Sequence, residues 1–179
     1  KVDLLGLQGG DRVAQTAAVS FDVSVWQCVA PLMVGAEVVV LDDATATIPW
    51  DLSGAVAREH VTVVELVPSL LQALLDGTTA EEGAGFRNLR WLVVTGEALA
   101  PELCRRWLAR YPDIPLVNAY GPTECADDVT HHVVRTPPPI DAIRIPIGRP
   151  IPGMHIDVVD EGLAPVASGV VGELCVIGV

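Results

Sequence analysis

Short apolar runs alternate with segments of helical periodicity along most of the chain. Val61–Leu66 and Trp91–Thr95 have the length of buried strands, whereas Ser24–Val34 and Glu102–Arg110 have the spacing of helices. Strands that alternate with helices are typical of a parallel sheet that is covered by helices on both faces. We therefore predict an α/β fold built on a doubly wound, mostly parallel sheet flanked by helices.

The bounds of the expected elements follow from the apolar runs and from the Gly, Pro, Ser and Asp residues at their ends. The expected strands are Asp11–Val19, Glu37–Leu41, Val61–Leu66, Trp91–Thr95 and Leu116–Ala119. The expected helices are Ser24–Val34 before Gly35, a helix from a cap at Asp51 through Glu59, Leu70–Leu75 after a cap at Ser69, and Glu102–Arg110 after Pro101. A polar loop is expected over Thr78–Gly85. Ligands of such sheets bind beyond the carboxyl ends of the strands, so the segments there are the first candidates for a site.

The run Thr136-Pro137-Pro138-Pro139 interrupts this pattern. After it we expect no helix, and short strands such as His155–Val159 and Glu173–Ile177 are typical of antiparallel β structure. We therefore place an α/β subdomain over residues 1–136 and the β-rich beginning of a barrel-like subdomain over residues 137–179. The chain begins without an initiator Met and stops inside an expected strand, so we expect it to be truncated at both ends.

Composition excludes several classes of partner. The 179 residues carry 11 basic and 23 acidic side chains, for a formal net charge of -12. This balance argues against a nucleic-acid partner, because phosphate backbones attract clusters of Lys and Arg. No apolar run is long enough for a membrane span, which needs about 18 residues or more. The four cysteines form no C-x-x-C pair, which argues against a zinc site and is consistent with reduced thiols in a cytoplasmic protein.

The most informative segment is Asn118-Ala119-Tyr120-Gly121-Pro122-Thr123-Glu124, at the end of an expected strand. Asn118 carries an amide that can read the edge of a nucleotide base, and Tyr120 offers a ring for stacking. After the Gly121-Pro122 turn, Thr123 offers a hydroxyl to a phosphate oxygen and Glu124 offers a carboxylate to Mg²⁺. The alternative is a plain strand, turn and helix start in which Thr123 is the cap.

This segment resembles the adenine- and magnesium-binding motif of the adenylation domains of nonribosomal peptide synthetases, which are adenylate-forming, AMP-binding enzymes. Other segments of the chain stand in the same order as further motifs of this family: Ser20–Trp26, Val94–Ala98, Gly148–Pro150 and Gly172–Gly178. The resemblance covers essentially the whole chain. It implies the central part of the large N-terminal subdomain of such a domain, with a flavodoxin-like sheet.

The resemblance also implies ATP and Mg²⁺ as cofactors, an amino acid as substrate, and a carrier protein with a phosphopantetheine arm as partner. The residues implied at the nucleotide are Gly96, Asn118, Ala119, Tyr120, Gly121 and Thr123. Thr123 would contact the α-phosphate and Glu124 would hold Mg²⁺, so these two are the candidate catalytic residues. Asp22 would pair with the α-ammonium group of the substrate, although an Asp two residues before Ser24 can equally cap a helix.

In this family scattered residues line the pocket for the substrate side chain. At the matching positions they are Asp22, Val23, Trp26, Glu65, Val93, Thr95, Ala119, Asp127 and Asp128. Glu65 lies in an apolar run, where an uncompensated carboxylate is costly. Together with Asp127 and Asp128 it predicts a basic substrate, and the bulk of Trp26 predicts a short one such as 2,4-diaminobutyrate or ornithine. The alternatives are an ion pair of Glu65 with an internal Lys or Arg, an outward-facing Glu65 on an edge strand, and a solvated helix start for the two aspartates.

The histidines His131 and His132 are interpreted as ordinary polar residues of a strand or loop. The family's phosphate loop, ribose-binding Asp and C-terminal lysine have no counterpart in this chain, where Lys1 is the only lysine. We therefore expect the isolated chain to be inactive, although it is part of an amino-acid-activating ligase. Two other readings stay open: a non-catalytic, excised specificity subdomain, and a fragment of an acyl- or aryl-activating ligase, whose substrates need no carboxylate at Asp22.

Overall fold

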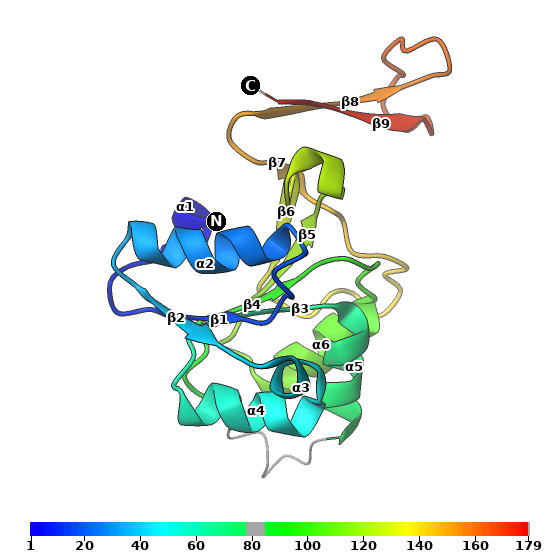
Figure 1. Ribbon diagram of the computed structural model, residues 1–179. Helices are drawn as coiled ribbons and strands as arrows, with labels where there is room; N and C mark the ends of the chain where they lie inside the picture. The colour runs from blue at the N-terminus through cyan, green and yellow to red at the C-terminus, as the bar shows by residue number, and fades with distance from the viewer. Residues whose placement is uncertain (78–84, 179) are drawn as a thin grey trace.

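A seven-stranded sheet forms the centre of the computed structural model, which describes residues 1–77 and 85–178 (Figure 1). Its strands are β1 (Arg12–Gln15), β2 (Glu37–Val40), β3 (Val63–Leu66), β4 (Trp91–Val94), β5 (Leu116–Tyr120), β6 (Thr130–Val134) and β7 (Arg149–Pro150). They lie in the order β2-β1-β3-β4-β5-β6-β7. The first five are parallel, and β6 and β7 run antiparallel to their neighbours. The predicted mostly parallel sheet is confirmed.

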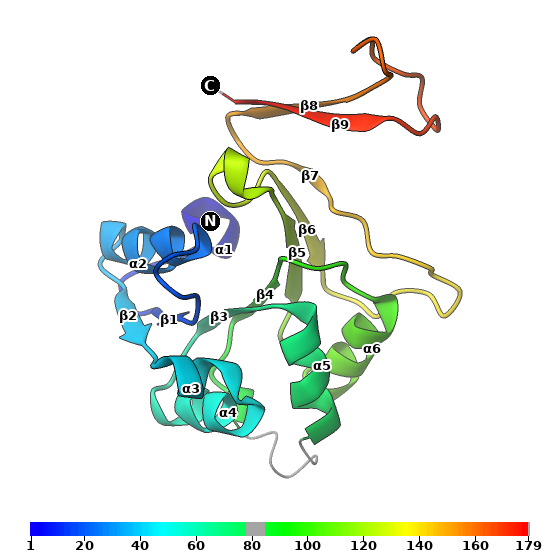
Figure 2. The ribbon, with the colours of Figure 1, turned by 45° about the vertical axis from the view of Figure 1, so that its right-hand side comes forward.

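Helices cover both faces of this sheet (Figures 1 and 2). On one face lie α1 (Val2–Leu5) and α2 (Val23–Met33); on the other lie α3 (Asp43–Thr47), α4 (Pro49–Arg58), α5 (Pro68–Gly77) and α6 (Pro101–Arg110). Every residue of β3 and β4 is buried, as expected for apolar strands packed on both sides. One core contains Trp26 and Val93, and the other contains Leu71 and Trp107. The predicted doubly wound arrangement is therefore confirmed.

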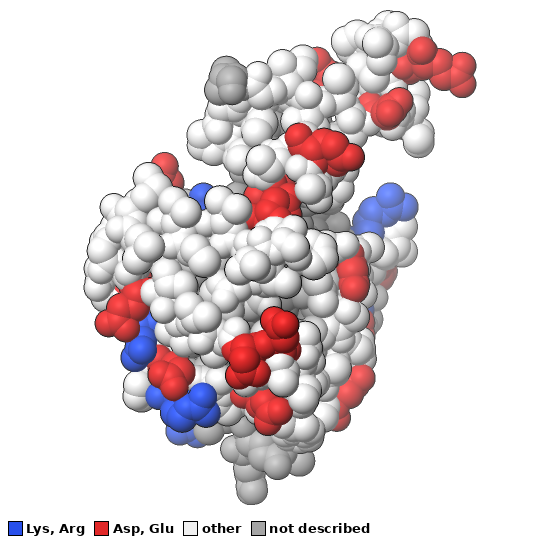
Figure 3. Space-filling view, in the orientation of Figure 1, with Lys and Arg blue, Asp and Glu red and all other residues white. Residues whose placement is uncertain are grey.

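The helix that follows β1, α2, ends before Gly35, as predicted. Gly35 has a φ of 73°, a left-handed conformation that favours glycine after a helix. The outer side of α2 exposes apolar side chains, namely Val25, Val29, Leu32 and Met33. The surface over α2 accordingly has few charged atoms, whereas acidic side chains are spread over other parts of the face drawn in Figure 3.

The last part of the described chain is β structure without helices, as predicted. β8 (Met154–Val159) and β9 (Glu173–Gly178) pair antiparallel in a sheet of their own. This hairpin lies apart from the main sheet in both ribbon views. Before it, β7 adds Arg149 and Pro150 to the main sheet by pairing with β6.

Some expected bounds are wrong for local reasons. The strand expected over Asp11–Val19 ends at Gln15, because the chain turns away there toward α2. The helix expected from a cap at Asp51 begins at Pro49, so Asp51 lies within its first turn. The helix expected after Ser69 begins at Pro68, and Ser69 donates from its N–H and its hydroxyl to the Glu97 carboxylate. The loop expected over Thr78–Gly85 lies outside the described residues except for Gly85.

The strand order indicates where a functional site is expected. The chain passes from β1 to β2 on one side and then crosses to β3 on the other, so the direction of winding changes between β1 and β3. In doubly wound sheets of this order, ligands bind at such a switch point, beyond the carboxyl ends of the strands. No helix within residues 1–77 and 85–178 combines the length and the apolar character that a membrane crossing needs.

Candidate active site

A cavity of about 810 Å³ opens at the carboxyl ends of β1, β3, β4 and β5, which includes the switch point. Its walls come from the segments that follow these strands, from the beginning of α2 and from α3. The predicted site residues that border it are Asp22, Val23, Glu65, Thr95, Gly96, Gly121, Thr123, Asp127 and Asp128. The structure thus brings together residues from five separate stretches of the sequence.

The other predicted site residues lie around this cavity and do not border it. Val93 and Ala119 are buried in the core beneath it, together with Trp26. The ring of Trp26 is covered by the side chain of Lys1, whose Nζ lies 4.4 Å from the ring centroid. Lys1 therefore fills the part of the pocket in which Trp26 was expected to meet a substrate.

Lys1 places a primary ammonium group among the three predicted pocket acids. Its Nζ lies 2.5 Å from Asp128 Oδ2, 3.1 Å from Glu65 Oε1 and 3.5 Å from Asp127 Oδ2. The four side chains are largely buried, and the most exposed, Asp127, is 14% exposed. The structure therefore contains the ion pair between Glu65 and a lysine that was one of the alternatives. The alternative of an outward-facing Glu65 is wrong, because β3 is a central strand.

Burial and neighbouring charges set the protonation of this cluster. Burial raises the pKa of Glu65 to about 7, with Lys1 acting in the opposite direction. Burial also raises the pKa of Asp127. It acts the same way on Asp128, but the hydrogen bond from His131 and the charge of Lys1 outweigh it and lower that pKa. Burial opposes the charge of Lys1, yet the carboxylates raise the pKa of its ammonium group. Asp128 is thus the acid most firmly held ionised, and Glu65 titrates near neutrality.

Two side chains from α2 orient Glu65. Trp26 Nε1 donates to Glu65 Oε2 at 2.7 Å, and Gln27 Nε2 donates to the same oxygen at 3.3 Å. Gln27 is fully buried, and its Oε1 accepts hydrogen bonds from the N–H groups of Thr16 and Ala17 at 3.0 Å each. Sequence reasoning missed Gln27. The available signal was a polar residue directly after Trp26 in an otherwise apolar helical segment.

Asp22 combines the two roles considered for it. Its Oδ1 accepts a hydrogen bond from the N–H of Val23 at 2.9 Å, so it caps the beginning of α2. Its Oδ2 accepts from the N–H of Asp127 at 3.1 Å. Because Asp22 also borders the cavity, capping does not exclude contact with a ligand.

An unusual backbone turn after β5 brings Asp127 and Asp128 into the cavity. Ala126 and Asp127 have φ values of 57° and 89°, left-handed conformations that non-glycine residues rarely adopt. Gly121 approaches the Asp127 carbonyl so closely that a side chain at this position would overlap it. The alternative of a solvated helix start is wrong, because Asp128 is 4% exposed.

The imidazole of His131 lies behind Asp128. His131 belongs to β6, as the interpretation as a strand residue allows, and its Nε2 lies 2.8 Å from Asp128 Oδ2. The side chain of His131 is 9% exposed. Sequence reasoning missed this pair, for which the only signal was the short spacing between the two residues.

The residues predicted to bind the nucleotide lie around the end of β5. Asn118 is buried, and its Nδ2 donates to the carbonyl of Pro146 at 2.8 Å, which ties β5 to the segment before β7. Tyr120 is 38% exposed, so part of its ring is accessible. Gly96 has a φ of 85°, which a glycine adopts without strain.

The segment with the candidate catalytic residues forms one short turn, η2 (Thr123–Cys125). Pro122 stands at the cap position and Thr123 is the first residue of the turn, so the alternative in which Thr123 caps a helix is wrong. Thr123 and Glu124 are both exposed. Within the described residues, no three His, Cys, Asp or Glu side chains are grouped to hold a metal ion. Glu124 would thus be a single carboxylate ligand, which suits Mg²⁺ that is bound mainly through substrate phosphates.

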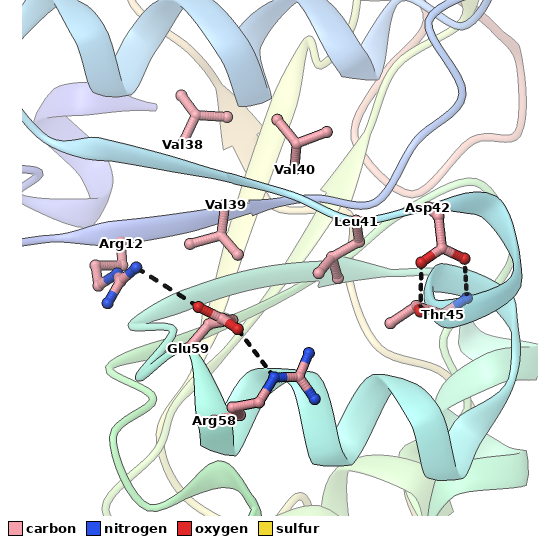
Figure 4. Close-up of a pocket in the computed structure, with 9 residues that line it drawn as sticks. All are labelled: Arg12, Val38, Val39, Val40, Leu41, Asp42, Thr45, Arg58 and Glu59. Carbon is pink, nitrogen blue, oxygen red and sulfur yellow. Dashed lines mark hydrogen bonds and ion pairs between the residues drawn. The ribbon is translucent and has the colours of Figure 1, made fainter.

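A second hollow, of about 370 Å³, lies along β2 and the end of α4 (Figure 4). Its charged residues are paired with one another. Arg12 and Arg58 both contact Glu59, and Asp42 accepts hydrogen bonds from Thr45. It borders none of the predicted site residues, so the larger cavity is the better candidate.

Comparison with known proteins places this geometry in a family. Residues 2–179 match the family described as AMP-binding enzyme. Phosphinothricin tripeptide synthetase PhsB from Streptomyces viridochromogenes is 42% identical over 95% of this chain, and enterobactin synthase component F from Escherichia coli is 34% identical over 97%. The chain spans 14% of each relative. The crystal structure of the nonribosomal peptide synthetase FmoA3 in its α-methyl-L-serine-AMP-bound form matches 99% of this chain with a TM-score of 0.85, at 29% identity and over 20% of that chain.

Proposed function

Because this chain belongs to the family of AMP-binding enzymes, we propose that it forms the central part of an amino-acid adenylation domain of a nonribosomal peptide synthetase. In the proposed reaction an oxygen of the substrate carboxylate bonds to the α-phosphorus of ATP, and the bond from that phosphorus to pyrophosphate breaks. The thiol of a carrier protein's phosphopantetheine arm then takes the acyl group and AMP leaves. The synthetases among the matched proteins support this proposal.

The nucleotide would bind at the end of β5. The accessible ring of Tyr120 would stack on adenine, with Gly96, Asn118, Ala119 and Gly121 around it. Thr123 would donate its hydroxyl to the α-phosphate, and Glu124 would hold Mg²⁺, which neutralises phosphate charge when bound. Catalysis by these residues would rest on positioning and charge compensation. The exposed turn that carries Thr123 and Glu124 at the cavity supports this assignment.

The amino-acid substrate would be held through its α-ammonium group by Asp22. This carboxylate borders the cavity at the beginning of α2 and lies beside the segment that carries Asp127. The substrate of an acyl- or aryl-activating ligase would have no α-ammonium group to pair with this carboxylate. The position of Asp22 therefore favours an amino acid.

The substrate side chain would be basic. The observation that carries this proposal is the position of Lys1 Nζ, a primary ammonium group within 3.5 Å of three carboxylates and over the face of Trp26. Such an arrangement attracts a cation both by charge and through the ring. In the proposed complex the ammonium group of a substrate such as ornithine or 2,4-diaminobutyrate takes this position and Lys1 leaves it.

Lys1 also supports a second candidate, a substrate with an uncharged side chain. If Lys1 keeps its position, its charge compensates the acids and a cation from the substrate is not needed. The remaining cavity would then accept a neutral group. The two candidates differ in the substrate that the complete domain prefers.

Pyrophosphate exchange by the complete adenylation domain tests the proposal. We expect exchange with ornithine or 2,4-diaminobutyrate to exceed exchange with norvaline, which has the carbon chain of ornithine without its side-chain ammonium. Preference for norvaline or another neutral amino acid would favour the second candidate. Exchange with a fatty or aryl acid alone would reject amino-acid activation altogether.

We also propose that the isolated 179-residue chain does not catalyse adenylation. Its sequence contains no counterpart of the phosphate loop or of the later catalytic lysine of the family. Positioning of ATP requires these groups as well as the residues of this cavity. Pyrophosphate exchange by this chain at the rate of a complete domain would show that the proposal is wrong.

A further inference from the structure

His131 lies outside the expected substrate-binding residues but touches one of them. It is carried by β6, opposite Ala119 of β5 on one side and Arg149 of β7 on the other. Pairing on both sides fixes the backbone that carries the imidazole. The side chain is largely buried, and its Nε2 lies 2.8 Å from Asp128 Oδ2.

We propose that His131 is a positioning residue for side-chain recognition, which holds Asp128 in the orientation that receives the substrate's ammonium group. This inference rests on the proposed basic substrate. Asp128 Oδ2 receives two donors, Nε2 of His131 and Nζ of Lys1, the latter at 2.5 Å. The hydrogen bond from the imidazole thus fixes the orientation of Asp128 Oδ2 toward the position of the cation.

The other acids of the pocket are oriented from different elements. Glu65 is held by Trp26 and Gln27 of α2 through its Oε2, which leaves Oε1 toward the ammonium group at 3.1 Å. Asp127 is connected through its backbone N–H to Asp22, and its buried Oδ1 has no hydrogen-bond partner among the described residues. Asp128 is therefore the acid whose side-chain orientation is fixed by a residue of β6.

A buried carboxylate needs such a donor whether or not a cation is present. Without the imidazole, Asp128 Oδ2 would lose a charge-assisted hydrogen bond, and its ionised form would become less favourable in a site with little water. It could then turn or take up a proton. Both changes weaken the attraction for an ammonium group and leave the binding of an uncharged side chain unaffected.

The test uses the complete adenylation domain with three variants. His131→Leu removes the donor and keeps similar bulk. His131→Gln keeps an N–H donor near the position of Nε2. His131→Asn is polar but too short to reach Asp128, and it replaces the leucine variant if that protein does not fold. Pyrophosphate exchange is measured with ornithine and with norvaline, and KM for ATP is measured in parallel.

We expect His131→Leu and His131→Asn to raise KM for ornithine by about tenfold or more, since hydrogen bonds to charged groups are worth roughly this factor. KM for norvaline and for ATP should stay unchanged, and His131→Gln should restore most of the ornithine activity. Equal losses with both amino acids would show a purely structural role and overturn the inference. Unchanged KM for ornithine in the leucine and asparagine variants would overturn it as well.

These outcomes are separable from those of the proposed function. A wild-type domain that prefers norvaline overturns both the basic-substrate proposal and the role of His131. A wild-type domain that prefers ornithine, with variants that do not discriminate between the two amino acids, overturns only the role of His131.

Discussion

Asp22 and Asp127 are joined by a hydrogen bond, although 105 residues separate them: Oδ2 of Asp22 accepts from the N–H of Asp127 at 3.1 Å. The residue proposed for the α-ammonium group is thus attached to the segment proposed for the side-chain cation. The α-ammonium group and the side chain of an amino-acid substrate would therefore be bound by two segments that are hydrogen-bonded to each other.

Replacing Asp22 by Ala should lower kcat/KM for every amino acid by about thirtyfold or more, because a buried charge pair with the α-ammonium group is lost. The loss should be similar for ornithine and norvaline, which share that group. Exchange kinetics of the complete domain measure it. Asp51→Ala, which removes an exposed carboxylate in the first turn of α4, is the control and should leave both values unchanged. Full activity of the Asp22 variant would instead favour an acyl- or aryl-activating ligase.

Sequence patterns predicted the carboxyl ends of β3, β4 and β5 to within one residue, because these strands lie in mostly apolar runs, whereas the end of β1 was expected at Val19 and lies at Gln15. They also predicted the unusual position of Glu65, since a carboxylate in such a run must find compensation. An ion pair with an internal Lys or Arg was among the alternatives, but the sequence did not identify Lys1 as the partner, because 64 residues separate the two. Periodicity gives the face of an element but not the distant segment that packs on it.

The positions of Asp127 and Asp128 depend on backbone conformations that composition does not reveal. Ala126 adopts a left-handed conformation without being a glycine. Short-range propensities therefore left a solvated helix start as an alternative, which the tertiary contacts with Gly121 and Asp22 exclude. Gln27 and His131 belong to the site through other contacts, with Glu65 and with Asp128 respectively.

The pH dependence of ornithine activation should reveal the ionisation of Glu65. Burial raises the pKa of this carboxyl to about 7, so the fraction that is ionised increases between pH 6 and pH 8. The side-chain amine of ornithine stays protonated in this range, since primary amines have a pKa of about 10. kcat/KM for ornithine should therefore rise through pH 7, whereas norvaline should show no such rise.

Glu65→Gln is the matched variant for this measurement. It keeps the shape of the side chain and removes the charge, so the rise through pH 7 should disappear and ornithine should lose its advantage. The contribution of Glu65 to folding stability has the opposite pH dependence from its contribution to ornithine activation. Because the pKa of Glu65 is raised on folding, its contribution to stability is present below pH 4.5 and lost as pH rises through 7. A flat pH profile of wild-type ornithine activity would contradict the role of Glu65.

Gln27 of α2 should also influence the pH dependence of kcat/KM for ornithine, because it donates a hydrogen bond to Glu65. Replacing it by Glu keeps an acceptor for the N–H groups of Thr16 and Ala17 but removes the donor to Glu65 and adds a second buried carboxyl 3.3 Å away. Two carboxyl groups this close do not both ionise readily. We expect the rise in ornithine activity to shift to higher pH by about one unit or more. Gln72→Glu, at an exposed position of α5, should leave the profile in place.

Lys1→Ala in the complete domain distinguishes a displaced lysine from a permanent one. A displaced Lys1 competes with the substrate cation, so its removal should lower KM for ornithine. The same change should raise KM for norvaline, because a neutral side chain then leaves Glu65, Asp127 and Asp128 without a cation. Breaking a buried ion pair costs about 3–5 kcal/mol, so the melting temperature should fall and ornithine should restore part of it. Asp3→Ala, in the first turn of the helix that Lys1 precedes, is the control for helix α1 itself. If Lys1 is instead a permanent part of the pocket, the wild-type domain prefers norvaline, and Lys1→Ala would reverse that preference rather than strengthen an existing preference for ornithine.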